Sequence, residues 1–269
     1  EWHEKATAEG LFVRTGRWKI EGSPIAILID FTTFFNQKDE IFSKLWEQYK
    51  LDSISGQWDY IEPTLFGYAA GLTIESFVRF HGLIKKKVVA HFHEWLTGAG
   101  LLYLKEFQPQ IGTVFTAHST VVGRRLAESG EPFYSQLNHF NGEQKAQDLG
   151  LVAKQSMERI TAHQAHVFST VSDITANECE QFLGKSPDLI TPNGFQFNPE
   201  VKSELDKERP SVRAKLLKVV SSLTGAELPN DTLLIGSGGR YEFRNKGMDV
   251  LIDSLGKLND SKKLQKPIV

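Results

Sequence analysis

From residue 88 onward, short apolar runs alternate with stretches in which apolar residues recur every three or four positions. Runs of the first kind are typical of buried strands, and stretches of the second kind are typical of core-facing helices. The expected strands are 88–92, 113–117, 167–171 and 189–191, and the expected helices are 95–107, 119–127 and one that Ser172 caps and that ends at Phe182. Because strands that alternate with helices usually run parallel, the sequence predicts an α/β fold with a parallel sheet flanked by helices.

Segments on both sides of this core predict further elements. Residues 10–20 and 24–30 are expected to form strands, and the second of these is expected to be buried on both faces because it is almost wholly apolar. The further expected helices are 39–51, 64–83, a single long helix over 143–166, 200–223 and 247–258. A connector at 225–230 precedes an expected strand at 232–236, and 267–269 is expected to begin another strand. We therefore predict a first domain over 1–230 and the beginning of a second over 231–269.

Charge and cysteine content exclude several classes of protein. The net charge is −2, and the sequence has no basic stripe that could displace counterions from nucleic acid. Cys179 is the single cysteine, which excludes an intrachain disulfide and a cysteine-rich zinc site and favours a reducing compartment such as the cytoplasm. No apolar run reaches the roughly 18 residues of a membrane-spanning helix. Because the chain begins at Glu1 without a methionine, we expect it to be a piece of a longer protein.

Polar side chains follow the first strand of the expected sheet, at His91, His93 and Glu94. Ligands of parallel α/β sheets bind at the carboxyl ends of the strands, so this segment is a candidate site. Imidazole and carboxylate groups can bind zinc, but a third clear ligand is missing. The alternative is a buried, hydrogen-bonded histidine, with His91 and His93 on one face of the strand.

Two later strand ends also carry candidate residues. His118 follows the strand 113–117 and precedes a helix that contains Arg124. A histidine beside a helix N-terminus can donate a hydrogen bond to a bound hydroxyl group or anion. Asn193 and Gly194 follow the strand 189–191 in an expected turn that would expose backbone amides, although most such turns bind nothing.

A glycine-rich loop follows the expected strand 232–236. Gly238 and Gly239 would let the backbone approach a ligand closely, and Arg240 and Lys246 could supply two cations for a diphosphate group. Solvated surface cations are the alternative interpretation of the same pair.

Several common motifs are absent from the sequence. The loop lacks the nucleotide fingerprint G-x-G-x-x-G, since Tyr241 occupies the last glycine position, and it is not a phosphate-binding P-loop. Neither a D-x-D motif nor a G-x-S-x-G nucleophile elbow occurs. The charge of a bound diphosphate would therefore have to be balanced by side chains and not by a metal ion.

Taken in order, these segments resemble the glycogen synthases of animals and fungi. The matching stretches are residues 15–22, 89–96, 115–120 with 123–124, 133–134, 140–141, 157–159 with 162–163, 165–172, 191–194, 239–243 and 245–247. The resemblance implies two Rossmann-like domains in the glycosyltransferase B (GT-B) arrangement, a sugar nucleotide donor and an α-1,4-glucan acceptor. It also implies transfer with retention of configuration and without a metal or other cofactor.

The resemblance also suggests roles for individual residues. Arg240 and Lys246 resemble the pair that holds the donor diphosphate and stabilises it as it leaves, and His118 resembles the active-site histidine near the transferred glucose. Arg124 resembles a cleft arginine close to that histidine. The further expected substrate contacts are Glu94, His93, Asn193, Gly194, Gly238 and Gly239.

Other features limit what the resemblance implies. Arg244 stands where the animal enzymes carry a small residue, so the chain looks more like a bacterial relative, and the choice between UDP-glucose and ADP-glucose stays open. The long helix over 143–166 resembles a segment of subunit contact, which predicts an oligomer. The family's donor loop and conserved glutamate fall outside residues 1–269, so we expect this piece alone to be inactive. A non-catalytic glucan-binding or regulatory module, and a GT-B transferase for another sugar or acceptor, are the alternatives.

Overall fold

The computed structural model describes residues 1–130, 132–195, 199–261 and 266–269. Contacts between Cα atoms divide the chain into two compact units. The first unit comprises residues 1–126 and 131–192, and the second comprises residues 127–130 and 193–269. The predicted domain boundary after residue 230 stays a prediction, and each unit is described below by itself.

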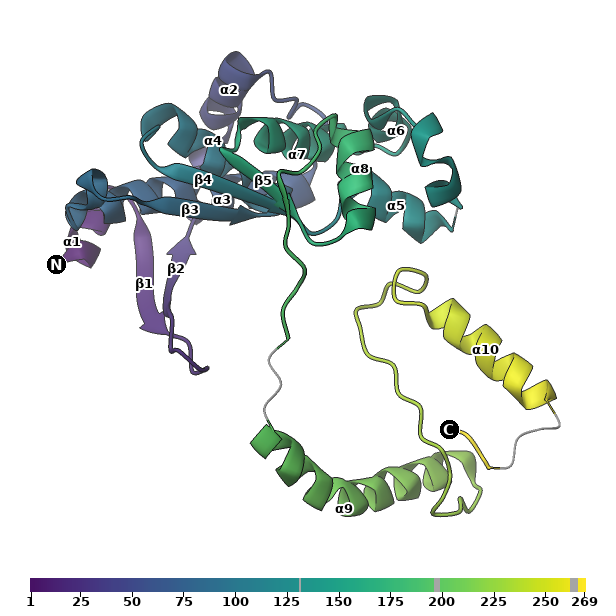
Figure 1. The fold of residues 1–269 in the computed structure, drawn as a ribbon. Helices are drawn as coiled ribbons and strands as arrows, with labels where there is room; N and C mark the ends of the chain where they lie inside the picture. Colours follow the sequence, from purple (N-terminus) through teal and green to yellow (C-terminus); the bar gives the residue numbers. More distant parts are fainter. Residues whose placement is uncertain (131, 196–198, 262–265) are drawn as a thin grey trace. The chain divides into compact units, whose positions relative to one another are not determined.

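A four-stranded parallel sheet forms the centre of the first unit (Figure 1). Its strands lie in the order β3 (Val89–His93), β4 (Gly112–Ala117), β5 (Val167–Thr170) and β6 (Leu189–Ile190). All three neighbouring pairs are parallel. The prediction of an α/β fold with a parallel sheet is thereby confirmed, and its strand boundaries agree to within one residue.

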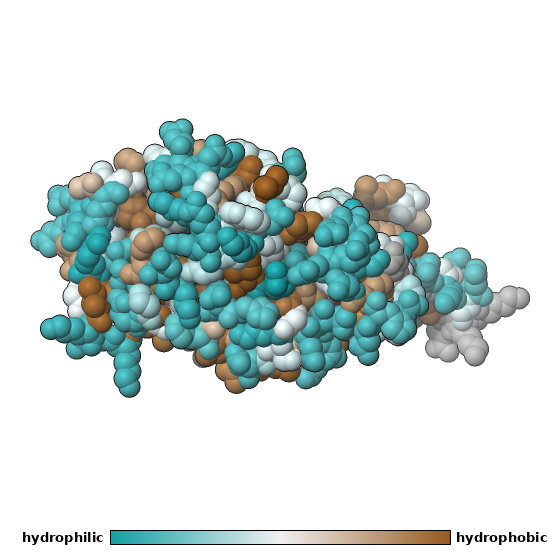
Figure 2. All heavy atoms as spheres, turned by 90° about the horizontal axis from the view of Figure 1, so that it is seen from above, coloured by the Kyte–Doolittle hydropathy of each residue, from teal (hydrophilic) through white to brown (hydrophobic). Residues whose placement is uncertain are grey.

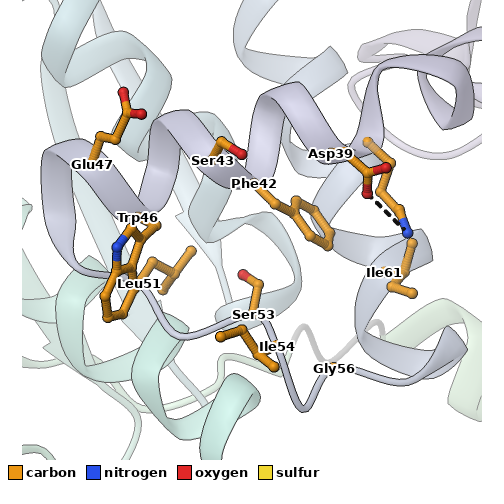
Figure 3. Close-up of a pocket in the computed structure, with 11 residues that line it drawn as sticks. Asp39, Phe42, Ser43, Trp46, Glu47, Leu51, Ser53, Ile54, Gly56 and Ile61 are labelled. Atoms are coloured by element: carbon orange, nitrogen blue, oxygen red, sulfur yellow. Dashed lines mark ion pairs between the residues drawn. The ribbon is translucent and has the colours of Figure 1, made fainter.

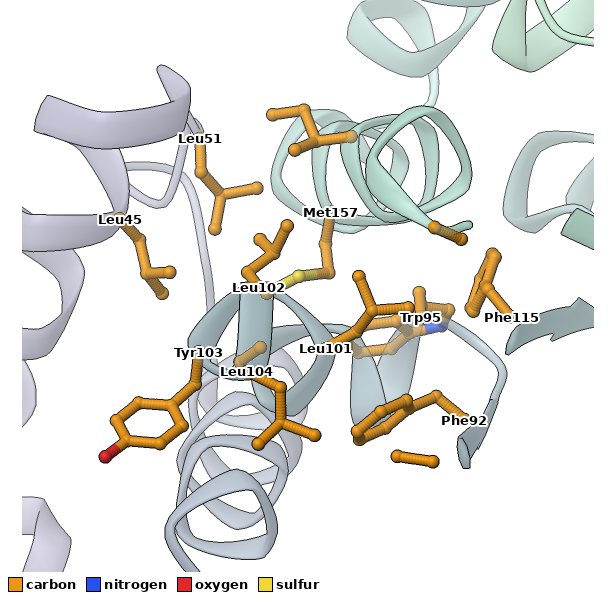
Figure 4. Packing of buried hydrophobic residues seen from close by; sticks show 14 of the residues in the cluster. Leu45, Leu51, Phe92, Trp95, Leu101, Leu102, Tyr103, Leu104, Phe115 and Met157 are labelled. Atoms are coloured by element: carbon orange, nitrogen blue, oxygen red, sulfur yellow. The ribbon is translucent and has the colours of Figure 1, made fainter. Parts of the chain in front are cut away.

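Helices flank this sheet and connect its strands. They are α3 (Trp58–Phe80), η3 (Trp95–Thr97), α4 (Gly98–Phe107), α5 (Val121–Ser129), η4 (Phe133–His139), α6 (Gly142–Asp148), α7 (Val152–Gln164) and α8 (Asp173–Leu183). Ser172 caps α8 as predicted, since its side chain accepts a hydrogen bond from the Thr175 amide. Trp95, Leu101, Leu102 and Met157 pack between α4, α7 and the sheet (Figure 4).

Glycines allow α3 to approach α4 and η3 closely. A Cβ atom at Gly71 would lie 2.9 Å from the carbonyl oxygen of Gly100 in α4, and a Cβ at Gly67 would lie 3.1 Å from the carbonyl oxygen of Leu96 in η3. Glycine inside a helix lowers its intrinsic stability. Here the missing side chains permit contact between backbones, which offsets that cost through tighter packing of the neighbouring side chains.

An antiparallel hairpin precedes these elements. The hairpin consists of β1 (Phe12–Arg17) and β2 (Ile25–Asp30). The helix α1 (Trp2–Ala8) comes before it in the chain. The elements η1 (Thr32–Gln37) and α2 (Lys38–Tyr49) follow it, and η2 (Leu83–Lys85) comes after α3. The expectation that the second strand is buried on both faces is wrong. Ile25 is 60% exposed and Leu28 is 65% exposed, because β2 pairs with β1 alone and does not join the central sheet.

The expected single helix over 143–166 is also wrong, since α6 ends before α7 begins. Gly150 has a φ of +68°, and the Leu151 amide donates to the Ala146 carbonyl at 2.7 Å. The Gly150 amide donates to Gln147 O at 3.1 Å, which completes the Schellman pattern of a helix that ends at a left-handed glycine.

We expect Gly150→Ala to lower the free energy of unfolding by about 1 kcal/mol, because a residue with a Cβ atom disfavours the left-handed conformation. Urea denaturation of the two proteins measures this difference. Gly16→Ala is the control, since a Cβ at Gly16 would meet nothing within 4 Å and its φ is not positive. Equal losses for the two variants would contradict the explanation.

The second unit contains α9 (Pro199–Thr224) and α10 (Met248–Asp260). The strand expected at 232–236 is reduced to one parallel bridge between Leu233 and Ile268. Backbone hydrogen bonds nevertheless join the two segments from Leu233 N to Pro267 O, from Val269 N to Leu233 O and from Ile235 N to Val269 O. Two parallel segments with α10 between them have the topology of the first β-α-β step of a second Rossmann-like domain.

The described surface is mainly polar in the view of Figure 2, with apolar side chains in small separate patches. Among the described residues, no helix combines the length and the apolar character that crossing a membrane requires.

Candidate functional site

The carboxyl ends of β3, β4 and β5 carry a line of hydrogen-bonded polar side chains. The Nε2 atom of His91 lies 2.7 Å from the hydroxyl of Thr116, and that hydroxyl lies 2.6 Å from the hydroxyl of Ser169. His91 is hydrogen-bonded, as one of the two interpretations expected, but its side chain is exposed and not buried. The same strand places Phe92 in the core, so that His91 and His93 share the opposite face.

His93 and His118 meet across the ends of β3 and β4. The Nδ1 atom of His93 lies 3.0 Å from Nε2 of His118. Partial burial lowers the pKa of His93, and the neighbouring His91 and His118 lower it further. A lowered pKa keeps the imidazole of His93 neutral at neutral pH, so one ring can donate the hydrogen bond that the other accepts.

Glu94 holds the backbone at the start of the turn that carries His118. Its Oε1 atom accepts a hydrogen bond from the His118 amide at 3.0 Å, and its own amide donates to the Thr116 carbonyl at 2.9 Å. Burial raises the pKa of Glu94, while the hydrogen bond from His118 acts in the opposite direction.

Glu94 also has a φ of +62° with a ψ of +161°. Such a conformation costs a non-glycine residue about 1 to 3 kcal/mol and is characteristic of functional sites. Two hydrogen bonds hold Glu94 in this strained conformation: its side chain accepts one from the His118 amide, and its own amide donates one to the Thr116 carbonyl.

The turn between β4 and α5 leads from His118 to Arg124. Thr120 is buried and donates its hydroxyl proton to Glu178 at 2.7 Å, while it accepts a hydrogen bond from the Gly123 amide at 3.0 Å. Tyr134 donates to the other oxygen of Glu178 at 2.8 Å. Arg124 lies in the first turn of α5 with an exposed side chain. The structure thus places His93, Glu94 and His118 together at the ends of β3 and β4, and Arg124 in the helix that follows β4. Their contact with a substrate stays a prediction.

Asn193 and Gly194 do not form the predicted turn. The Thr191 amide donates to the Thr170 carbonyl at 2.7 Å, and residues 191–195 then continue without a turn. Gly194 is not among the glycines with positive φ. Both residues belong to the second unit. Their contact with a substrate stays a prediction.

The glycine-rich loop of the second unit brings its cations into defined local positions. The Nε atom of Arg240 lies 3.1 Å from a carboxylate oxygen of Glu242. A Cβ atom at Gly239 would lie 3.1 Å from Cγ of Lys246, so the missing side chain makes room for the lysine. Gly238 stands in open space. That Arg240 and Lys246 border one opening with His118 stays a prediction.

Two observations bear on other possible sites in the described part of the chain. No group of three or more His, Cys, Asp or Glu side chains there is arranged to hold a metal ion. A cavity of about 500 Å3 lies between α2 and the segment that leads to α3, and it includes Phe42, Trp46 and Ile54 (Figure 3). This cavity shares no residue with the sheet edge that carries His118.

Sequence reasoning missed Glu158 and Glu178 as partners of this edge. Both lie on helices whose carboxylates ordinarily face water. The motif at residues 157–159 contained a signal for Glu158, because this charged residue interrupts the apolar face of a helix.

A parallel sheet with helical crossovers, polar strand ends and the start of a second β-α-β step together define a Rossmann-like α/β protein, an architecture consistent with a GT-B glycosyltransferase domain. The family model described as glycogen synthase matches residues 3–269. The chain therefore belongs to the glycogen synthase family.

Curated relatives support this assignment. The chain is 35% identical to the glycogen [starch] synthase of Neurospora crassa over 254 residues, which cover 93% of this chain and 36% of that protein. It is 35% identical to the liver glycogen [starch] synthase of Homo sapiens with the same coverage. It is 34% identical to the Caenorhabditis elegans glycogen [starch] synthase over 94% of this chain and 38% of that protein. The chain thus spans a little over a third of the length of these relatives.

Proposed function

We propose that this chain belongs to a glycogen synthase, which transfers glucose from a sugar nucleotide to the non-reducing end of an α-1,4-glucan with retention of configuration. The family match over residues 3–269 carries this proposal. The relatives named glycogen [starch] synthase support it, because each aligns with more than nine tenths of this chain.

In the proposed reaction, Arg240 and Lys246 hold the donor diphosphate, and Gly238 and Gly239 allow the backbone to approach it. Negative charge develops on the leaving diphosphate, and cations already in position stabilise that charge without reorganising during the reaction. No metal ion or other cofactor is required in this proposal.

The edge of the first unit would bind the transferred glucose. His118 lies beside His93, and its backbone is held by Glu94, so its imidazole can donate a hydrogen bond in a fixed direction. Arg124 adds positive charge in the first turn of α5. In this proposal Asn193 and Gly194 also contact the substrate.

The remaining expectations complete the proposal. The donor is UDP-glucose or ADP-glucose, the full-length protein is an oligomer, and the reaction takes place in the cytoplasm. Because the relatives are nearly three times as long as the aligned region, we expect residues 1–269 alone not to transfer glucose.

Transfer of radiolabelled glucose from UDP-glucose or ADP-glucose to glycogen, assayed with the full-length protein, tests the proposal. We expect one donor to give incorporation that a chelator leaves unchanged. Incorporation that chelation abolishes would contradict the reaction without a metal. No incorporation from either donor, together with binding of glycogen, would instead support a non-catalytic glucan-binding module.

A further inference from the structure

Three carboxyl groups surround residues 118–121, the turn between β4 and α5. They come from distant parts of the first unit: the end of β3, α7 and α8. The contacts join His118 N to Glu94 Oε1 at 3.0 Å, Thr120 Oγ1 to Glu178 Oε2 at 2.7 Å and Val121 N to Glu158 Oε2 at 3.1 Å. The turn that carries His118 is therefore held at three successive points by side chains from outside its own element.

Glu158 is the most deeply buried of these three groups. Its side chain is 0% exposed, and its Oε1 atom has no hydrogen-bond partner among the described residues. Burial raises the pKa of Glu158 well above its ordinary value, and the charges of Glu94 and Glu178 raise it further against the hydrogen bond from Val121. Burial therefore favours the protonated, neutral form of this carboxyl group.

A buried carboxyl group with one unpaired oxygen is costly for folding. An apolar side chain would fill the same space in α7 without that cost. A carboxyl group differs from an apolar side chain at this position because it can accept the hydrogen bond from Val121 N. The Val121 amide is one of those at the start of α5 that have no partner within the helix. Glu158 thus fixes the point at which α5 begins, three residues after His118.

We propose that Glu158 is a positioning residue, which fixes the turn 118–121 through the Val121 amide and thereby orients the imidazole of His118 against His93. The consequence for catalysis rests on the proposed function, whereas the consequence for His118 itself does not. Glu158 does not line the sheet edge and need not touch a substrate.

Glu158→Met and Glu158→Gln in the full-length protein test this role. The two replacements have similar size and are both uncharged, but glutamine alone keeps an oxygen that can accept the Val121 hydrogen bond. We expect Glu158→Gln to retain kcat within about threefold. We expect Glu158→Met to lower kcat about tenfold or more with little change in KM, because small misplacements of a catalytic group are costly.

Hydrogen–deuterium exchange at the imidazole C2 carbon, followed by mass spectrometry, reads the environment of His118 without any need for activity. We expect the exchange half-life of His118 to change at least about threefold in Glu158→Met and to stay unchanged in Glu158→Gln, with His81 as an internal reference. If the unmodified protein transfers no glucose from either donor, the proposed function fails, yet this exchange still tests the role of Glu158.

Gln155→Met is the matched control. Gln155 lies one turn earlier in α7, is also buried and donates its side-chain hydrogen bond to the Phe182 carbonyl at 3.0 Å, away from the turn. We expect Gln155→Met to lower the free energy of unfolding without changing kcat or the exchange half-life of His118. If Glu158→Met folds and matches Gln155→Met in both readouts, the proposal is overturned. If Glu158→Met does not fold, Glu158→Ala replaces it, and unchanged His118 exchange in that variant overturns the proposal equally.

Discussion

Replacement of Arg240 by alanine in the full-length protein is expected to lower kcat for glucose transfer about a hundredfold or more. The loss of one preorganised charge donor has this magnitude when the donor faces charge that develops in the transition state. Because a hundredfold in rate corresponds to about 2.7 kcal/mol, the effect is far larger than that of a surface ion pair. Initial rates at saturating donor and glycogen measure it directly.

Lys246 requires a different replacement, because its methylene groups pack against Gly239. Lys246→Met keeps most of this apolar contact and removes the charge, so we expect a similar loss of kcat from the charge alone. Lys257→Ala, at an exposed lysine of α10, is the control and should leave kcat unchanged. Near-normal turnover in either Arg240→Ala or Lys246→Met would remove the assignment of these cations to the diphosphate.

The central sheet could be predicted from sequence because its signal is local and repeated. Each of the strands β3, β4 and β5 is a short apolar run followed by a helical period, and neither feature depends on distant residues. The hairpin β1–β2 could not be predicted in the same way. Its second strand is as apolar as a buried one, and only its pairing with β1 alone shows that Leu28 faces solvent.

The candidate site was only partly predictable for a related reason. His93, Glu94 and His118 stand at strand ends, where the topology of parallel sheets brings them together. The groups that hold the turn come from far along the chain, since Glu158 lies 37 residues beyond Val121 and Glu178 lies 58 beyond Thr120. No spacing rule relates such positions, so their role follows from the packing of α7 and α8.

Gly100→Ala is expected to produce a large loss of stability in the first unit. A Cβ atom there would collide with the carbonyl oxygen of Gly67 and would lie 2.9 Å from Cε1 of Phe92. A backbone oxygen inside α3 cannot move away by rotation of a side chain, so α3 and α4 must separate. Overpacking of this kind costs about 3 kcal/mol. Thermal unfolding followed by circular dichroism should show Tm lower by about 6 to 12 °C.

Two further variants determine whether backbone contact is the cause. Gly112→Ala is the control, because its Cβ would lie 3.5 Å from Val89 Cγ2, an ordinary packing distance, and we expect Tm to stay within about 2 °C. A Cβ atom at residue 71 in Gly71→Ala would lie 2.9 Å from the carbonyl oxygen of Gly100. The double variant Gly71→Ala/Gly100→Ala should therefore lose less stability than the sum of the two single losses, because the first replacement already separates the helices. Strict additivity would mean that the two positions do not share one interface. Gly67 also faces the backbone of η3, which begins directly after Glu94, so this same close packing supports the residue that holds the His118 turn.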